Sequence, residues 1–92
     1  MENFLQIFYE FMATFLILIG IYFVIMDFKK NTFLGVGIIV ALSVIIEAHV
    51  NPAVTGMFML TNNAPISSIY TRIVPQILAM IAAAFTISQL NN

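Results

Sequence analysis

Long apolar runs, separated by short polar interruptions, predict that most of this chain is helical. The residues from Phe4 to Met26 are almost continuously apolar and rich in Phe, Ile and Leu. About 23 residues at a rise of about 1.5 Å each would cross a hydrocarbon core about 30 Å thick. A second run, roughly Phe33 to Ile46, is short for a crossing and needs its flanking residues or a locally thin bilayer. We predict that both runs are transmembrane helices.

The apolar pattern breaks after the second run and then resumes as a short segment. Asn51 is a natural N-cap for this segment, and Pro52 suits the first helical position, where no amide donor is needed. The segment of about ten residues ends at Asn62 and Asn63, so its helix would span about half of a membrane. We therefore predict a re-entrant half-helix.

A final helix is predicted from about Ser67 or Arg72 to Gln89. Pro75 is interpreted as a helix-start residue, because proline is tolerated in the first turn of a helix. Arg72 closely follows Tyr70, and we interpret this pair as an anchor at the membrane interface. The fold expected over residues 1–92 is a single all-α membrane domain with two transmembrane helices, the half-helix and a third transmembrane helix.

Composition indicates which solvent surrounds the chain. Of its 92 residues, 62% are hydrophobic and 8% are charged, whereas soluble domains carry about 25% charged residues. We therefore expect an integral, multi-pass membrane protein in a lipid bilayer. The net charge of -1 gives no indication of a nucleic-acid partner. The absence of cysteine excludes disulfides and thiolate metal sites.

The remaining polar residues do not suggest an enzyme or a resident metal. No nucleophile–base pair is recognisable along the chain. Glu47 and His49 are two positions apart and have no third partner at a spacing typical of metal ligands. We expect no catalytic activity, no metal site and no cofactor.

Nine consecutive positions after the second run form a motif, Ala48-His49-Val50-Asn51-Pro52-Ala53-Val54-Thr55-Gly56. This segment resembles the first signature loop of the aquaporin and glycerol-facilitator family. Glu10-Phe11 followed by Thr14 resembles the first helix of that family, and Gln76 with the small residues after it resembles the third helix. The resemblance implies a passive channel for water or small uncharged solutes such as glycerol.

Members of that family usually join two three-helix halves of inverted orientation, each with an Asn-Pro-Ala motif. This chain contains the motif once, so the resemblance implies a pore completed by a second half, most simply an inverted copy of the same chain. Four such pores around an axis would contain eight chains. Lys29 and Lys30 on one side are nearly balanced by Arg72 and the amino terminus on the other, as insertion in both orientations requires.

Small residues would allow close contact between helices. They occur on the second and third long helices, at Gly35, Gly37, Ala41, Ser43, Ala79 and Ala83.

The resemblance also implies roles for residues of the pore. Asn51 of each half would donate its amide hydrogens to a passing water or alcohol, and His49, Pro52 and Ala53 belong to the same signature. Val54 stands at the position where the second signature of the family normally carries a filter arginine. A homodimer would therefore present Val54 twice and have no arginine there.

Other residues are expected to support or flank the pore. The resemblance implies that Glu10 would be a buried acceptor that braces the loop through its backbone donors, with Thr14 and Gln76 as further bracing residues. The filter position of the second helix falls near Phe33 or Leu34. Glu47 replaces a residue that is usually small in the family, and it is either a vestibule residue or an interfacial charge.

Two other functions stay open at this point. Glu10 lies in the middle of an apolar run, where a charge costs about 2.5–3.5 kcal/mol on insertion scales. It could be the substrate-binding carboxylate of a dual-topology, proton-coupled small transporter. The chain could also be a non-selective, holin-like membrane protein, which would not depend on Asn51.

Overall fold

The computed structural model describes residues 2–26 and 30–90, without the side chains of Glu2 and Lys30. Lys29, and with it most of the polar turn between the first two helices, lies outside the described residues. The described part contains no strand. It forms α1 (Glu2–Met26), α2 (Lys30–Ile45), α3 (Pro52–Leu60), the π-helical turn η1 (Ile69–Ile73) and α4 (Val74–Leu90). The prediction of an all-helical fold is confirmed.

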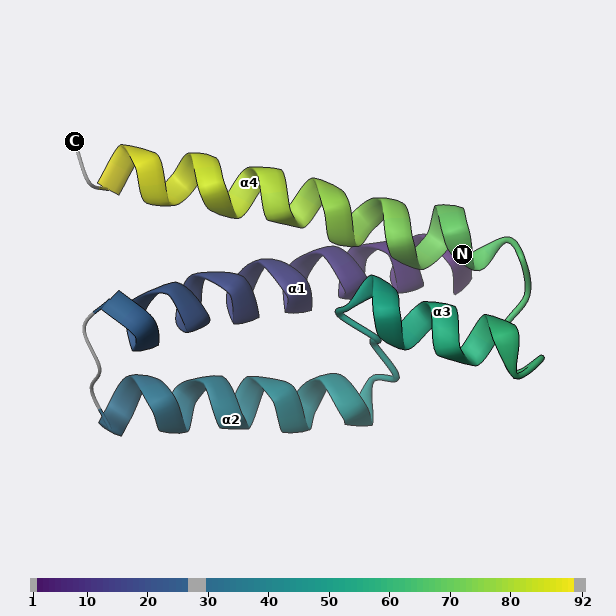
Figure 1. The fold of residues 1–92 in the computed structure, drawn as a ribbon, viewed down its shortest axis with the longest axis horizontal. Coiled ribbons are helices and arrows are strands. Elements are labelled where there is room, and N and C mark those ends of the chain that lie inside the picture. Colours follow the sequence, from purple (N-terminus) through teal and green to yellow (C-terminus); the bar gives the residue numbers. More distant parts are fainter. Residues whose placement is uncertain (1, 27–29, 91–92) are drawn as a thin grey trace.

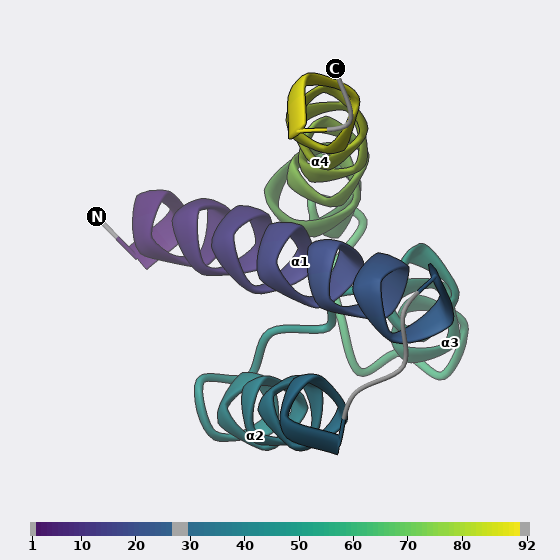
Figure 2. The ribbon, with the colours of Figure 1, turned by 90° about the vertical axis from the view of Figure 1, so that its left-hand side faces the viewer.

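α1 is the central helix of the molecule (Figure 1). Seen end-on, α4 and α2 lie on opposite sides of α1, and the short α3 lies beside it (Figure 2). The contacts follow this arrangement, because α1 packs against both α2 and α4, whereas α3 packs against η1. The loop between α2 and α3 runs from the end of α2 towards α1, where α3 begins alongside the long helices (Figure 1).

Small side chains bring α1 and α4 together. Ala79 and Ala83 of α4 are buried, as is Ala13 of α1, so the two backbones approach closely. The contact of α2 with α1 depends on a different glycine from those expected. A Cβ atom on Gly20 of α1 would lie 2.5 Å from Cγ2 of Val36, whereas a Cβ atom on Gly37 would meet nothing within 4 Å.

The distribution of side chains is the reverse of that in a soluble protein. Large apolar side chains are exposed along the long helices, among them Ile25, Val44 and Phe85. The buried side chains include a polar set formed by Glu10, Thr14, Ser43, Thr55, Ser68 and Gln76. Two stretches, Asn3–Met26 and Ile69–Leu90, are long and apolar enough to cross a membrane, whereas α2 is apolar but shorter. These features are compatible with a membrane protein.

The interpretation of Pro75 as a helix-start residue is wrong. The last helix already begins at η1, and Pro75 follows as the second residue of α4. In η1 the amide of Val74 donates to the carbonyl of Ile69, five residues earlier. Proline has no amide hydrogen and its ring crowds the carbonyl four residues before it, so a wider π turn lets the helix continue through this position.

Candidate functional site: a braced loop at the start of a short helix

The carboxylate of Glu10 is the centre of the polar set, and its side chain is 0% exposed. Its Oε2 accepts hydrogen bonds from the amide of His49 at 2.8 Å and from Nη1 of Arg72 at 2.5 Å. Its Oε1 accepts from the amide of Val50 at 2.9 Å and from Nε2 of Gln76 at 3.1 Å. Four donors from three segments of the chain therefore converge on one carboxylate, which ties the loop to α1 and α4.

Arg72 is not the interfacial anchor that the sequence suggested. It lies in η1, and its side chain is only 12% exposed and forms an ion pair with Glu10. Nη1 also donates to the carbonyl oxygen of Glu47 at 2.6 Å. A carboxylate buried among apolar helices needs a compensating charge and hydrogen-bond donors, which Arg72 supplies together with a clamp on the loop backbone.

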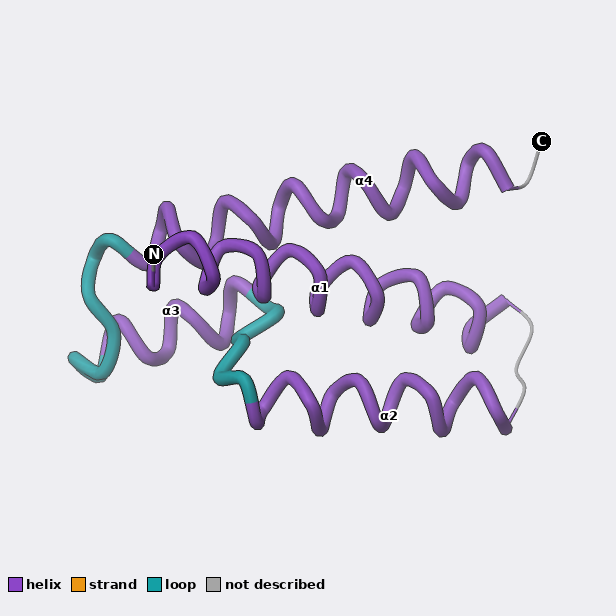
Figure 3. The backbone as a smooth tube through the Cα atoms, turned by 180° about the vertical axis from the view of Figure 1, so that it is seen from behind, coloured by secondary structure: helices purple, strands orange, loops and turns teal. Residues whose placement is uncertain are grey.

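The loop backbone, drawn in teal between α2 and α3 in Figure 3, is held in an unusual conformation. Glu47 and Val50 have positive φ angles of 59° and 55°. Such angles are rare for a β-branched residue such as valine, and they persist where neighbouring contacts impose them. The bond from the amide of Val50 to Glu10 is one such contact.

The carbonyl groups of the loop differ from its amides in their hydrogen bonding. The amides of His49 and Val50 donate to Glu10. Among the described residues, none donates a hydrogen bond to the carbonyls of Ala48, His49 or Val50. Three successive acceptors are therefore left for a solvent molecule or a solute.

Asn51 is the N-cap of α3, as predicted. Its Oδ1 accepts a hydrogen bond from the amide of Ala53 at 2.7 Å, and Pro52 occupies the first turn of the helix. Because the oxygen of the amide group is used in the cap, its Nδ2 keeps two hydrogens with no acceptor among the described residues. Asn51 is exposed, so these donors are accessible from the surface of this chain.

A second series of polar contacts orients His49. Thr55 is fully buried, and its Oγ1 accepts from Nε2 of Gln76 at 3.2 Å. The same Oγ1 lies 2.9 Å from Nδ1 of His49. The imidazole ring stacks on Phe58 with 4.8 Å between the ring centroids. The imidazole ring of His49 is thus held at one edge by Thr55 and on one face by Phe58. Gln76 donates to both Glu10 and Thr55.

Three of the expected site residues are placed away from the loop. Thr14 is buried, but its hydroxyl has no hydrogen-bond partner among the described residues, so it does not brace the loop in this way. It lies one helical turn beyond Glu10. Phe33 and Leu34 lie near the start of α2, about 18 Å along the helix from its loop end, so one chain does not bring them to Asn51.

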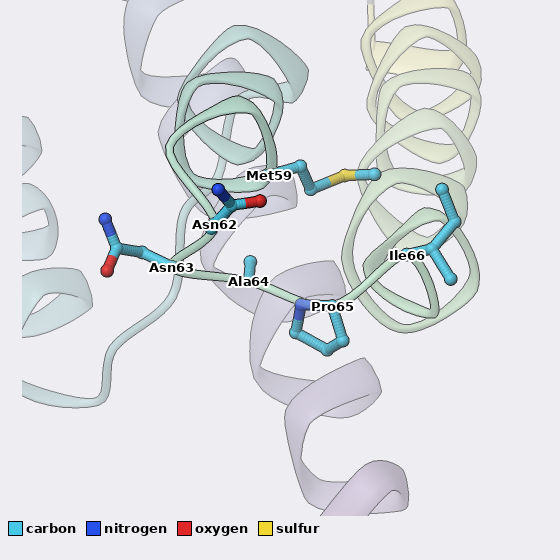
Figure 4. Close-up of a pocket in the computed structure, with 6 residues that line it drawn as sticks. All are labelled: Met59, Asn62, Asn63, Ala64, Pro65 and Ile66. Carbon is cyan, nitrogen blue, oxygen red and sulfur yellow. The ribbon is translucent and has the colours of Figure 1, made fainter.

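A surface cavity of about 570 Å³ lies along this loop. Val40 and Val44 of α2, Val54 and Phe58 of α3, and the backbone of the loop border it, together with Glu47 and Arg72. A larger depression of about 650 Å³ lies elsewhere, at the loop after α3, where Met59, Asn62 and Ile66 contribute to its lining (Figure 4). No charged residue and none of the expected pore residues borders that depression.

The described residues contain no group of three or more His, Cys, Asp or Glu that could hold a metal ion. Sequence reasoning assigned no role to Thr55 and the wrong role to Arg72. The spacing of Arg72 and Gln76 was an available signal, because residues four apart lie on the same face of a helix. Both donate to Glu10. Comparison of the chain with protein-family models, characterised proteins and solved structures finds no match.

Proposed function

We propose that this chain forms half of an aquaporin-type channel that passes water and small uncharged solutes, glycerol-like molecules included. The proposal rests mainly on one observation, the different hydrogen bonding of the amides and the carbonyls in the loop before α3. Its amides are drawn inward to Glu10. The carbonyls of Ala48, His49 and Val50 and the Nδ2 of Asn51 have no partner among the described residues. A row of acceptors followed by a donor is what a line of water molecules needs.

The channel requires that the chain be a multi-pass membrane protein. The apolar exterior and the two long apolar helices support this requirement. In a bilayer α2 would be the short crossing, and α3 would be re-entrant from the loop. Irregular backbone at membrane depth is tolerated only where it is buried in protein or lines a water-filled cavity. The loop before α3 would meet the second condition, because a cavity lies along it.

A single chain would supply only half of the pore lining. The cavity beside the loop is bordered by α2, the loop and α3, and α4 contributes nothing to it beyond the turn that holds Arg72. We propose that an inverted second copy closes it and brings a second Asn51 to the first. Four such pores, or eight chains, is the assembly that the resemblance implies.

The paired half-helices would exclude ions. The N-terminus of α3 carries the positive end of its helix dipole, and two of these ends would meet near the membrane centre. A cation would be repelled there. The donors of the two Asn51 side chains would orient a passing water by its oxygen, which interrupts a continuous proton wire.

The arrangement of Glu10 favours a bracing role over a transporter carboxylate. A proton-coupled carboxylate must release its partners to bind a proton or a substrate. Glu10 accepts four hydrogen bonds and is paired with Arg72, so binding a proton would break contacts that hold the loop. The channel is therefore the better-supported function.

The test is stopped-flow light scattering of liposomes that contain the purified protein, challenged with an impermeant sugar and then with glycerol. The key variant is Asn51→Asp, because Asp caps a helix as well as Asn does but has no amide donors. We expect fast shrinkage for the wild type, slower shrinkage for Asn51→Asp, and an increased cation leak. Asn31→Asp in the first turn of α2 is the matched control and should behave as wild type.

Two results would contradict the proposal. Shrinkage no faster than that of empty liposomes, with incorporation and helical content verified, would exclude a homomeric water channel. An ion leak in the wild type that Asn51→Asp leaves unchanged would indicate a non-selective, holin-like protein.

A further inference from the structure

Two buried oxygen atoms in the interior of the helix bundle have no hydrogen-bond partner among the described residues. They are Oγ1 of Thr14 in α1 and Oε1 of Gln76 in α4. The two residues are only 3% and 2% exposed, and neither borders the cavity along the loop. Buried polar atoms are nearly always paired with a protein group or with an ordered water molecule. Each of these oxygens therefore needs a partner that bulk solvent does not supply.

The unpaired oxygen of Gln76 is a consequence of what its nitrogen does. Nε2 donates to Oε1 of Glu10 at 3.1 Å and to Oγ1 of Thr55 at 3.2 Å, so both of its hydrogens are used. Turning the amide group over would place its oxygen against the carboxylate of Glu10, which has no hydrogen to donate while it is paired with Arg72. The hydrogen-bond network therefore assigns the amide orientation, and Oε1 is left as an acceptor without a donor.

The hydroxyl of Thr14 does not use the partner that helical hydroxyls often have. A Ser or Thr within a helix can donate to the carbonyl four residues earlier. Ser43 of α2 and Thr86 of α4 both do so, at 2.8 Å. Thr14 makes no such bond to the carbonyl of Glu10. Its hydrogen and its two lone pairs are therefore available to another group.

Thr14 and Gln76 are both placed next to Glu10. Thr14 follows Glu10 by four residues, so it lies on the same face of α1 and one helical turn further along. Gln76 bonds directly to Glu10, and its helix packs against α1 and starts at the same end of the molecule (Figure 1). The two oxygens do not bond to each other. Neighbouring polar groups that are too far apart for direct contact are commonly joined by one water molecule.

The chemistry of the two oxygens suits a water better than an ion. Calcium takes six to eight oxygen ligands and magnesium requires an octahedral set, whereas this position offers two uncharged oxygens. The nearby charge of Glu10 is already compensated by Arg72, so it does not attract a cation. A water molecule can accept from the hydroxyl of Thr14 and donate to Oε1 of Gln76. It thereby satisfies both atoms at once.

We propose that Thr14 and Gln76 form a binding site for one internal water molecule, buried between helices and separate from any pore. Internal waters typically make about three hydrogen bonds, and the second hydrogen of this water is available for a further acceptor beside it. The water extends the polar network of Glu10 by one turn along α1. The site does not depend on the proposed channel function, because it lies away from the cavity along the loop.

The first test is the chemical unfolding of the full chain in detergent. Thr14→Val replaces the hydroxyl by a methyl group, so the water loses one partner and Oε1 of Gln76 holds it less well. We expect the ratio of folded to unfolded protein to fall about fivefold, the effect of about one net hydrogen bond. A hydroxyl that is simply unpaired predicts the opposite sign, because its removal would raise stability. Thr86→Val is the matched control and should change little, since the carbonyl that its hydroxyl contacts keeps its place in the helix.

The second test is a crystal structure at a resolution that shows ordered waters. The wild type should show a density peak within hydrogen-bond distance of both Oγ1 of Thr14 and Oε1 of Gln76. Thr14→Ser, which keeps the hydroxyl, should retain the peak, and Thr14→Val should lose it. Unchanged or raised stability of Thr14→Val, or a direct bond between the two side chains without a peak, overturns the proposal. If Thr14→Val does not fold, the densities of the wild type and Thr14→Ser decide. Neither test measures flux, so a failure of the channel proposal leaves both results valid.

Discussion

The two helices that flank α1 are held to it by different kinds of contact. On the α4 side, an ion pair and directional hydrogen bonds around Glu10 join the helices, and small residues such as Ala79 close the gap. On the α2 side, the helices fit together sterically, because Gly20 has no side chain and leaves room for Val36. Directional contacts thus secure the side that positions the loop, whereas α2 keeps an exposed apolar outer face.

The largest expected effect on stability comes from removing the ion pair between Glu10 and Arg72. Glu10→Gln removes the charge opposite Arg72 and leaves a buried guanidinium uncompensated, which costs about 3–5 kcal/mol for buried pairs. We expect a corresponding loss in the free energy of unfolding, measured by circular dichroism in detergent. The double variant Glu10→Gln/Arg72→Gln should recover part of this loss. A single-variant loss below about 1 kcal/mol would show that the ion pair does not secure the α4 side.

The next test disrupts the steric fit between α1 and α2. Gly20→Ala places a methyl group 2.5 Å from Cγ2 of Val36, so the Val36 side chain or the whole of α2 must shift. Overpacking of this kind costs about 1–3 kcal/mol. Thermal unfolding should show the loss, and Gly20→Ala/Val36→Ala should restore stability because the second change removes the clashing atom. Failure of that rescue would contradict the proposed closeness of α1 and α2.

A smaller effect is expected at the loop that joins the two sides. Asn51→Ala removes the side-chain acceptor of the α3 cap, which costs about 1 kcal/mol. Asn51→Asp keeps the acceptor and should cost little. Chemical unfolding of both variants separates the capping role from the pore role, because only the pore role predicts that Asn51→Asp loses water flux while it retains stability.

The smallest effect tests the free face of α2. A methyl group on Gly37 meets nothing within 4 Å, and alanine favours a helix over glycine by about 1 kcal/mol. Gly37→Ala should therefore raise the stability of the isolated chain slightly. If a second copy packs closely on this glycine, the sign reverses under conditions in which the chains associate. Unfolding measured at several protein concentrations distinguishes the two cases.

Much of the fold was predictable because its signals are local. Apolar run length predicted α1, and the Asn51-Pro52 pair predicted the start of α3. The spacing of Arg72 and Gln76 indicated only that they share a helix face. It could not place Arg72 against Glu10, because an interfacial and a buried arginine differ in what faces them from other helices. Pro75 was misread for a related reason, since the π turn that accommodates it depends on the helix continuing on both sides. The role of Gly20 in helix packing could not be predicted, because it depends on the side chain of Val36 on another helix.

The pairing of Glu10 with Arg72 also affects the order in which the protein can be assembled. The two residues are 62 positions apart. At about 5–20 residues per second, Arg72 is synthesised roughly 3–12 s after Glu10. In a membrane, α1 would spend this interval with an unpaired carboxylate. We therefore expect that, in a membrane, the first helix would stay sheltered beside the insertion machinery until the last helix arrives. The helices would then enter the bilayer as a set and not one at a time.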